Sequence, residues 1–325
     1  MHPAASVILL TTLIGTGQGL FLALFTAESY AAFGLLPHVE SSFLSAGALL
    51  ALVLLATGLA ASFFHLGHPE RAWRAAAQWR TSWLSREVIA LPAFMGALFI
   101  YGALHYCEIN PRLGLLPSGA PIELSAVIGS GASLLAFVLF ICTAMIYASL
   151  RFLREWHSPL TVINYILLGG ASGFTLAAAL STLMIPELAR FFAGWAVVLT
   201  VTGLISRSAS LIRNAHLKPK STLQTAIGIK HPRIVQKTQG AMGGSFNTRE
   251  FFHGQSAILL RQAKWAFLLL AFVVPLLLLL ANLGTPGSAP LWVAFTVQFA
   301  GLMVERWFFF AQANHPQNLY YQVVS

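Results

Sequence analysis

The sequence predicts an all-α membrane protein, a single bundle of eight transmembrane helices. Hydrophobic residues make up 57% of the 325 residues and charged residues only 9%. The mean hydropathy is +0.73. Several apolar stretches reach the roughly 20 residues that a helix needs to cross the core of a bilayer. Together these observations indicate a polytopic helical protein rather than a soluble one.

The expected spans are taken in chain order. They cover residues 5–27, 43–66, 87–106, 124–150, 159–185, 188–206, 265–283 and 290–311. The first has no basic stretch ahead of it and no clear cleavage site before Glu28, which argues against a cleaved signal peptide. Its glycines at 15, 17 and 19 predict close packing against another helix. Four arginines separate the second span from the third, at 71, 74, 80 and 86.

The later spans carry their own signals. Arg151 and Arg154 follow the fourth, and the glycine-rich stretch 169–173 gives the fifth a small-residue face for packing. Only Pro186 and Glu187 separate the fifth span from the sixth. Pro275 predicts a kink in the seventh, with the freed carbonyl satisfied inside the bundle.

The positive charges predict the orientation. With eight spans, the loops after spans two, four and six share a side with both termini, and 17 of the 19 lysines and arginines fall there. Only Arg112 and Arg190 fall on the other side. Positive residues are retained on the cytoplasmic face, so both termini are expected to be cytoplasmic in a bacterial inner membrane. The basic face suits anionic lipid, alone or with an acidic protein partner. No nucleic-acid partner is expected, because no nucleic-acid fold displays the charge.

We treat residues 1–325 as one integral-membrane domain with a long basic loop at 207–264. Within that loop, Lys218–Thr248 is polar, basic and interrupted by prolines and glycines. This composition suits an extended arm that docks on another surface, with a disordered linker as the alternative.

Several classes of chemistry are disfavoured. The chain has no aspartate, which removes the usual carboxylate cages for calcium or magnesium. It has no phosphate-binding loop with lysine, no Cys-x-x-Cys and no Gly-x-Ser-x-Gly motif. Its two cysteines, Cys107 and Cys142, indicate neither a disulfide framework nor a thiolate metal site. We therefore expect no metal site and no substrate chemistry on this chain alone.

A polar cluster at the junction of spans two and three is the candidate site. His65 and Glu87 lie at the ends of these spans, and Arg86 stands beside Glu87. An imidazole and a carboxylate can exchange protons with a quinone whose tail lies in an apolar channel. The alternative is structural, with Glu87 complementing a helix N-terminus and His65 bonded to a carbonyl at the interface. Haem is not expected, because His65 and His105 fall at opposite membrane faces and the other histidines lie in loops or tails.

The same junction resembles a known family. Its residues are similar to those of the membrane anchor subunits of dimethyl-sulfoxide-reductase-type molybdoenzymes, and the eight spans extend the likeness over nearly the whole chain. The residues that carry the resemblance are His65-Leu66-Gly67, Pro69, Arg71-Ala72, Ser82 and Ser85-Arg86-Glu87, with weaker support from Tyr147, Trp156, Pro159, Gly301, Arg306 and Phe309.

The resemblance implies a role in electron transfer. Such anchors hold a molybdopterin catalytic subunit and a four-cluster iron–sulfur subunit on the membrane, and they exchange electrons with ubiquinone or menaquinone. The quinol-site histidine and glutamate of the family would map onto His65 and Glu87, with Arg71 nearby. The partner subunits would carry the molybdopterin and the clusters.

The predicted orientation departs from that of dimethyl sulfoxide reductase anchors, which present this site to the periplasm. A cytoplasmic site and the opening stretch Met1–Ile8 make the chain most similar to anchors of cytoplasmic sulfite dehydrogenases that reduce quinone. One alternative is a dimethyl sulfoxide reductase anchor that oxidises menaquinol, and another is a purely structural anchor. A secondary transporter is the remaining alternative, but the sequence shows neither an internal repeat nor a charge at the midplane of the membrane.

Overall fold

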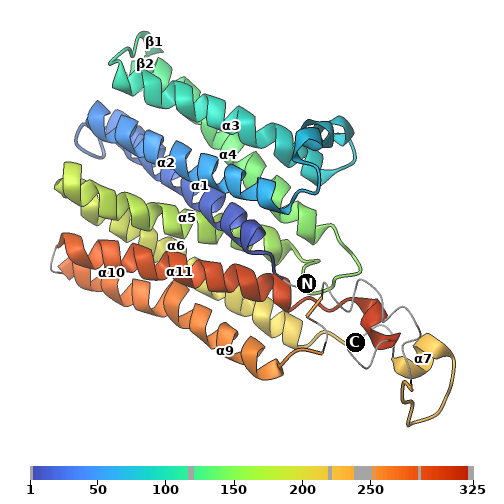
Figure 1. The fold of residues 1–325 in the computed structure, drawn as a ribbon. Helices are drawn as coiled ribbons and strands as arrows, with labels where there is room; N and C mark the ends of the chain where they lie inside the picture. Colours follow the sequence, from blue (N-terminus) through green and yellow to red (C-terminus); the bar gives the residue numbers. More distant parts are fainter. Residues whose placement is uncertain are drawn as a thin grey trace.

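The computed structural model describes residues 3–115, 121–218, 222–237, 251–252, 254–284 and 287–320. Within these ranges the chain forms a bundle of long, roughly aligned helices with one small β-hairpin (Figure 1). Eight helical segments of the described residues are long and apolar enough to cross a membrane. The prediction of eight transmembrane helices is therefore confirmed.

The long helices follow one another with short connections. They are α1 (Ala5–Ala32), α2 (Ser41–Ser62), α3 (Trp83–Tyr106), α4 (Leu124–Ala148), α5 (Pro159–Met184), α6 (Ala189–Ala215), α9 (Ala257–Leu268), α10 (Val274–Gly284) and α11 (Ser288–Ala311). Shorter elements are η1 (Phe63–His65), η2 (Pro69–Gln78), β1 (Arg112–Leu115), β2 (Pro121–Glu123), η3 (Pro186–Leu188), α7 (Leu223–Ile227), η4 (Leu269–Val273) and η5 (Pro316–Tyr320). Helices α9 and α10, joined by η4, form the seventh span.

Several helices run further than hydropathy predicts; the seventh span, for example, begins at Ala257 instead of residue 265. Helix α1 continues to Ala32 and α6 to Ala215, so Glu28 and Arg207 lie inside helices instead of in loops. Each of these charges has an oppositely charged or hydrogen-bonding partner on a neighbouring helix. A partner offsets the cost of burying a charge, so the helix continues past it.

Helices α1 and α5 form the centre of the bundle. In each, 72% of the most apolar window is buried, compared with 33–50% in the other six spans. The two backbones meet at glycines: a Cβ on Gly19 would lie 2.0 Å from the carbonyl oxygen of Gly169. A Cβ on Gly173 would lie 2.0 Å from the carbonyl carbon of Gly19. The predicted small-residue faces thus pack against each other.

Pro275 disturbs the seventh span as expected. The five residues of η4 form a π-helical turn directly before Val274 and Pro275. Because proline has no N–H, it cannot donate to the carbonyl of Ala271, four residues earlier. The Gln298 amide of α11 donates to that carbonyl at 3.4 Å, so the bundle supplies the partner.

The two ends of the bundle differ. The β1–β2 hairpin lies at one end, while both termini and α7 lie at the other (Figure 1). The short helix α7 begins with a capping box between Thr222 and Thr225, and it contacts η5. Part of the predicted arm is therefore helical, and its residues 219–221 and 238–248 lie outside the described ranges.

Candidate functional site

The start of α3 is organised around Arg86. Its Nε donates to the carbonyl of Trp79 and its Nη2 to the carbonyl of Arg80, both at 2.9 Å. The guanidinium carbon lies 4.2 Å from the centre of the Trp83 ring. Two hydrogen bonds and a cation–π contact hold this charge in one place, where η2 meets the helix.

Glu87 is half-buried and faces the neighbouring helix α4. The Thr143 hydroxyl donates a hydrogen bond of 2.5 Å to its Oε1. This bond crosses between two helices, so the carboxyl does more than complement the N-terminus of its own helix. The partner, Thr143, belongs to a membrane span. A carboxyl group that faces the inside of a membrane protein is costly to bury and is usually functional.

An apolar groove of about 430 Å³ runs along α3 and α4 beside this pair. It is lined by Trp79, Trp83, Arg86, Ile89, Ala90, Ala93, Leu135, Val138, Ile141 and Cys142. Arg86 and Cys142 of this lining are the chain neighbours of Glu87 and Thr143. Ile89, Val138 and Ile141 are exposed, and exposed apolar residues of a membrane span face lipid. The groove can therefore take an apolar chain from the bilayer and lead it to a polar end.

The other two predicted site residues lie on the connection between α2 and α3. His65 is the last residue of η1, and its side chain is outside what the structure describes. Arg71 lies on η2, where it is exposed and its Nε is 3.8 Å from Oε1 of Glu70. The structure thus brings Arg86 and Glu87 together at one helix start, and within the described contacts it pairs Arg71 with Glu70.

The comparisons with known proteins can now be set beside this geometry. The model of the family described as DMSO reductase anchor subunit (DmsC) matches residues 1–321. The chain belongs to this family. This anchor is also 56% identical, over 326 residues and the full length of both chains, to a protein of Allochromatium vinosum that is named as a subunit of sulfite dehydrogenase. The family predicted from the junction of spans two and three is confirmed.

The anchor also buries a charged cluster that the sequence alone did not predict. Arg207 of α6 places its Nε 2.8 Å from Oε1 of Glu305 on α11, and Arg306 places its Nη1 3.5 Å from the other carboxylate oxygen. All three side chains are almost completely buried. The adjacent charges Glu305 and Arg306 inside an apolar span could have indicated such a cluster from the sequence. Arg207 was hidden because hydropathy placed it in a loop.

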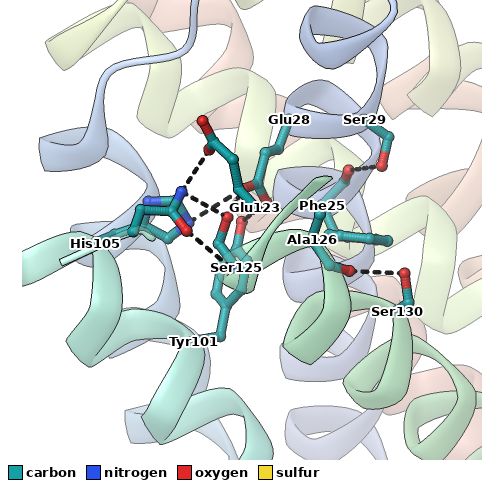
Figure 2. A network of polar contacts seen from close by, with 10 residues as sticks. Phe25, Glu28, Ser29, Tyr101, His105, Glu123, Ser125, Ala126 and Ser130 are labelled. Carbon is teal, nitrogen blue, oxygen red and sulfur yellow. Dashed lines mark hydrogen bonds and ion pairs between the residues drawn. The ribbon is translucent and has the colours of Figure 1, made fainter. Parts of the chain in front are cut away.

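A second polar network joins α1, α3 and α4 at the opposite end of the anchor (Figure 2). The Glu28 carboxylate accepts hydrogen bonds of 2.6 Å from Tyr101 and from Ser125. His105 Nε2 lies 3.4 Å from the same carboxylate. Asn110 extends the network by donating to Ser125 at 2.9 Å. This arrangement fixes three helices to one another beside the β-hairpin.

Proposed function

We propose that this chain is the quinone-reactive membrane subunit of a sulfite dehydrogenase complex. The full-length identity of 56% to a protein named as a sulfite dehydrogenase subunit supports the choice of complex. The observation that carries the quinone site is the Glu87–Thr143 pair beside an apolar groove. Sulfite oxidation itself belongs to a molybdopterin partner, and electrons reach the anchor through an iron–sulfur partner.

The residues at the start of α3 fit a quinone. A quinone accepts two electrons and two protons, and its isoprenoid tail needs an apolar channel. The groove between α3 and α4 offers that channel, and its lining changes from apolar to cationic at Arg86. The carboxyl group of Glu87 can give and take a proton, and an imidazole such as that of His65 exchanges protons near neutral pH. Ubiquinone and menaquinone both have such a quinone head group and isoprenoid tail, so either fits the proposed site.

The orientation is part of the proposal. In the topology that the sequence predicts, 17 of the 19 basic residues share a side with the termini, which supports a cytoplasmic position in the bacterial inner membrane. The Glu87 site lies near the same end, so the iron–sulfur and catalytic partners would dock from the cytoplasm. The predicted basic arm, Lys218–Thr248, would contribute to this docking.

The test compares two matched pairs of variants in the purified complex. His65→Ala and Glu87→Gln are expected to lower sulfite-driven quinone reduction by about 100-fold or more, because each removes a proton-transfer group. His38→Ala and Glu40→Gln are the controls, since both residues are exposed and lie on the connection between α1 and α2, at the opposite end of the bundle. Sulfite oxidation with a soluble dye acceptor should survive in all four variants.

Two results would contradict the proposal. Wild-type quinone reduction in Glu87→Gln would exclude the site, as would equal losses in the control variants. Loss of the dye-linked activity as well would show a failure of assembly, and binding of the iron–sulfur subunit to the variant anchor would then identify the defect.

The family description supports one second candidate, a dimethyl sulfoxide reductase anchor that oxidises quinol. Both candidates use the same groove and the same carboxyl group, but electrons run in opposite directions. Supplying the purified complex with quinol and dimethyl sulfoxide separates them. Sulfoxide reduction without sulfite-driven quinone reduction would favour the second candidate and would remove the argument for catalytic partners on the cytoplasmic side.

A further inference from the structure

Behind Glu87, the bundle encloses a small cavity among α1, α4, α5 and α11. It leaves about 20 Å³ for the centre of a water molecule, which is enough to hold one. Its lining includes Thr143, Tyr165 and Arg306, together with Thr11 and Thr12 of α1. Thr143 is the residue whose hydroxyl donates to Glu87, so the cavity begins one hydrogen bond away from the proposed quinone site.

A second cavity, of about 10 Å³, continues from the first toward the end that carries the termini. Tyr165 and Arg306 line both cavities. The second one extends to Glu155, in the connection between α4 and α5. Glu155 is half-buried, so this carboxyl group lies between the cavity and the aqueous surface.

Several polar atoms around the second cavity could form hydrogen bonds with a water molecule. Within the described part of the chain, three buried atoms of its lining residues have no hydrogen-bond partner and are not among the atoms that pair Glu305 with its two arginines: Tyr165 Oη, Asn164 Oδ1 and Arg207 Nη2. A buried polar atom without a partner costs about 1–3 kcal/mol, whereas an ordered water with several partners removes that cost. Three such atoms around one cavity indicate a bound water rather than a dry void.

A direct route from Glu87 to the surface past Arg86 is less suitable for proton transfer than the cavities are. Arg86 stands next to Glu87, and its cation is held in place by two backbone carbonyls and the Trp83 ring. A fixed positive charge repels an approaching proton. Along the cavities, the carboxylate of Glu305 offsets one of the two cations, Arg207 and Arg306.

We propose that the two cavities, joined at Tyr165, form the route by which protons reach Glu87 from the aqueous phase at Glu155. This inference rests on the proposed quinone-reducing function and adds the proton path to it. Reduction of one quinone takes two electrons from the iron–sulfur partner and two protons, and both protons end in new O–H bonds. For each proton that Glu87 gives up, it takes one from the Thr143 hydroxyl, which takes one from cavity water.

The remaining steps restore that proton from outside. The Tyr165 hydroxyl passes a proton from the second cavity to the first and is itself reprotonated from the second cavity. Arg306 lies 3.7 Å above the centre of the Tyr165 ring and keeps the phenol in position. Burial raises the pKa of Glu155 despite the nearby cations of Arg154 and Arg213 and a backbone hydrogen bond from Asn314, so this carboxyl group can take up protons at a higher pH than an exposed one.

The experiment removes one hydroxyl from the route. In the purified complex, Tyr165→Phe is expected to lower sulfite-driven quinone turnover by about tenfold or more and to raise the ratio of the rates in H2O and D2O. Tyr30→Phe is the matched control, because Tyr30 lies near the opposite end of the bundle against Phe191 and Trp195. It should leave both quantities unchanged. Glu155→Gln should show a milder loss that grows as the pH rises.

A readout without turnover is needed as well. A high-resolution cryo-EM map of the wild-type complex is expected to show ordered water between Thr143 and Tyr165, and between Tyr165 and Glu155. Dry cavities would overturn the proposal, and so would wild-type turnover with an unchanged isotope effect in Tyr165→Phe. If Tyr165→Phe loses dye-linked sulfite oxidation too, the density for water in the wild type decides the matter.

The two proposals fail in different ways. Normal quinone reduction in Glu87→Gln would remove the quinone site itself, and the route with it. An inactive Glu87→Gln combined with a fully active Tyr165→Phe would leave the quinone site standing and exclude the route. A slow Tyr165→Phe with normal binding of a quinone-analogue inhibitor supports both.

Discussion

Gly173→Ala tests the contact on which the centre of the bundle depends. A Cβ at this position would lie 2.0 Å from the carbonyl carbon of Gly19 and 2.1 Å from the amide nitrogen of Leu20. Ordinary contact starts at 3.4 Å, so α1 and α5 would have to separate by about 1.4 Å. Both atoms belong to the backbone of α1, and no change of rotamer can relieve the clash.

The destabilisation caused by the clash can be compared with the stabilisation that alanine usually gives in a helix. Overpacking a core typically costs about 1–3 kcal/mol, and a backbone clash belongs at the upper end of that range or above it. Replacing glycine by alanine inside a helix gains about 1 kcal/mol from helix propensity. We therefore expect a net loss of about 2 kcal/mol or more in the free energy of unfolding.

The control makes the same substitution where space is open. A Cβ at Gly194 of α6 would meet no atom within 4 Å, so Gly194→Ala should leave stability unchanged or raise it slightly. Thermal unfolding of the full-length chain in detergent compares the two variants with the wild type. Equal unfolding temperatures for Gly173→Ala and Gly194→Ala would refute the argument from helix separation.

Two further predictions concern polar groups. Ser125→Ala removes a donor to the Glu28 carboxylate and should cost about 1–3 kcal/mol, whereas Ser130→Ala, which loses only a bond to a carbonyl of its own helix, should cost little in the same unfolding assay. The second prediction concerns Glu155→Gln. Burial raises the pKa of the Glu155 carboxyl group above its ordinary value of 4.5. The folded state therefore binds this proton more tightly than the unfolded state does. That difference lowers stability as the pH rises above 4.5, so the variant should unfold with the wild type at pH 4 and at a higher temperature at pH 7.5; a parallel pH dependence would exclude this assignment.

Hydropathy predicted the number of helices because the length of an apolar stretch is a property of the sequence alone. It ended α1 and α6 too early because it treats every charge as costly to bury. Glu28 and Arg207 have partners on other helices, and those partners become visible only when the helices are packed. The turn at Pro186 was predictable since proline and a charge interrupt two apolar stretches there.

The candidate site was predictable only in part. Glu87 stood out because charged residues are scarce in this chain. Thr143 gave no signal, because a threonine in a span usually bonds to a carbonyl one turn earlier, as Thr12 does with Ile8. Only the packing of α3 on α4 turns that hydroxyl toward a carboxylate and forms the groove beside it.

The anchor buries two polar networks, and their hydrogen bonding separates their roles. At the hairpin end, the Glu28 carboxylate is surrounded by side-chain partners from α3 and α4, which fix its geometry. At the other end, Tyr165 Oη, Asn164 Oδ1 and Arg207 Nη2 have no hydrogen-bond partner within the described part of the chain, and their residues line cavities of the size of a water molecule. A network saturated by protein groups holds helices together but has no free site for a moving proton. A network that needs water keeps such sites, and this one lies on the side of the bundle where the proposed quinone site at Glu87 would require protons.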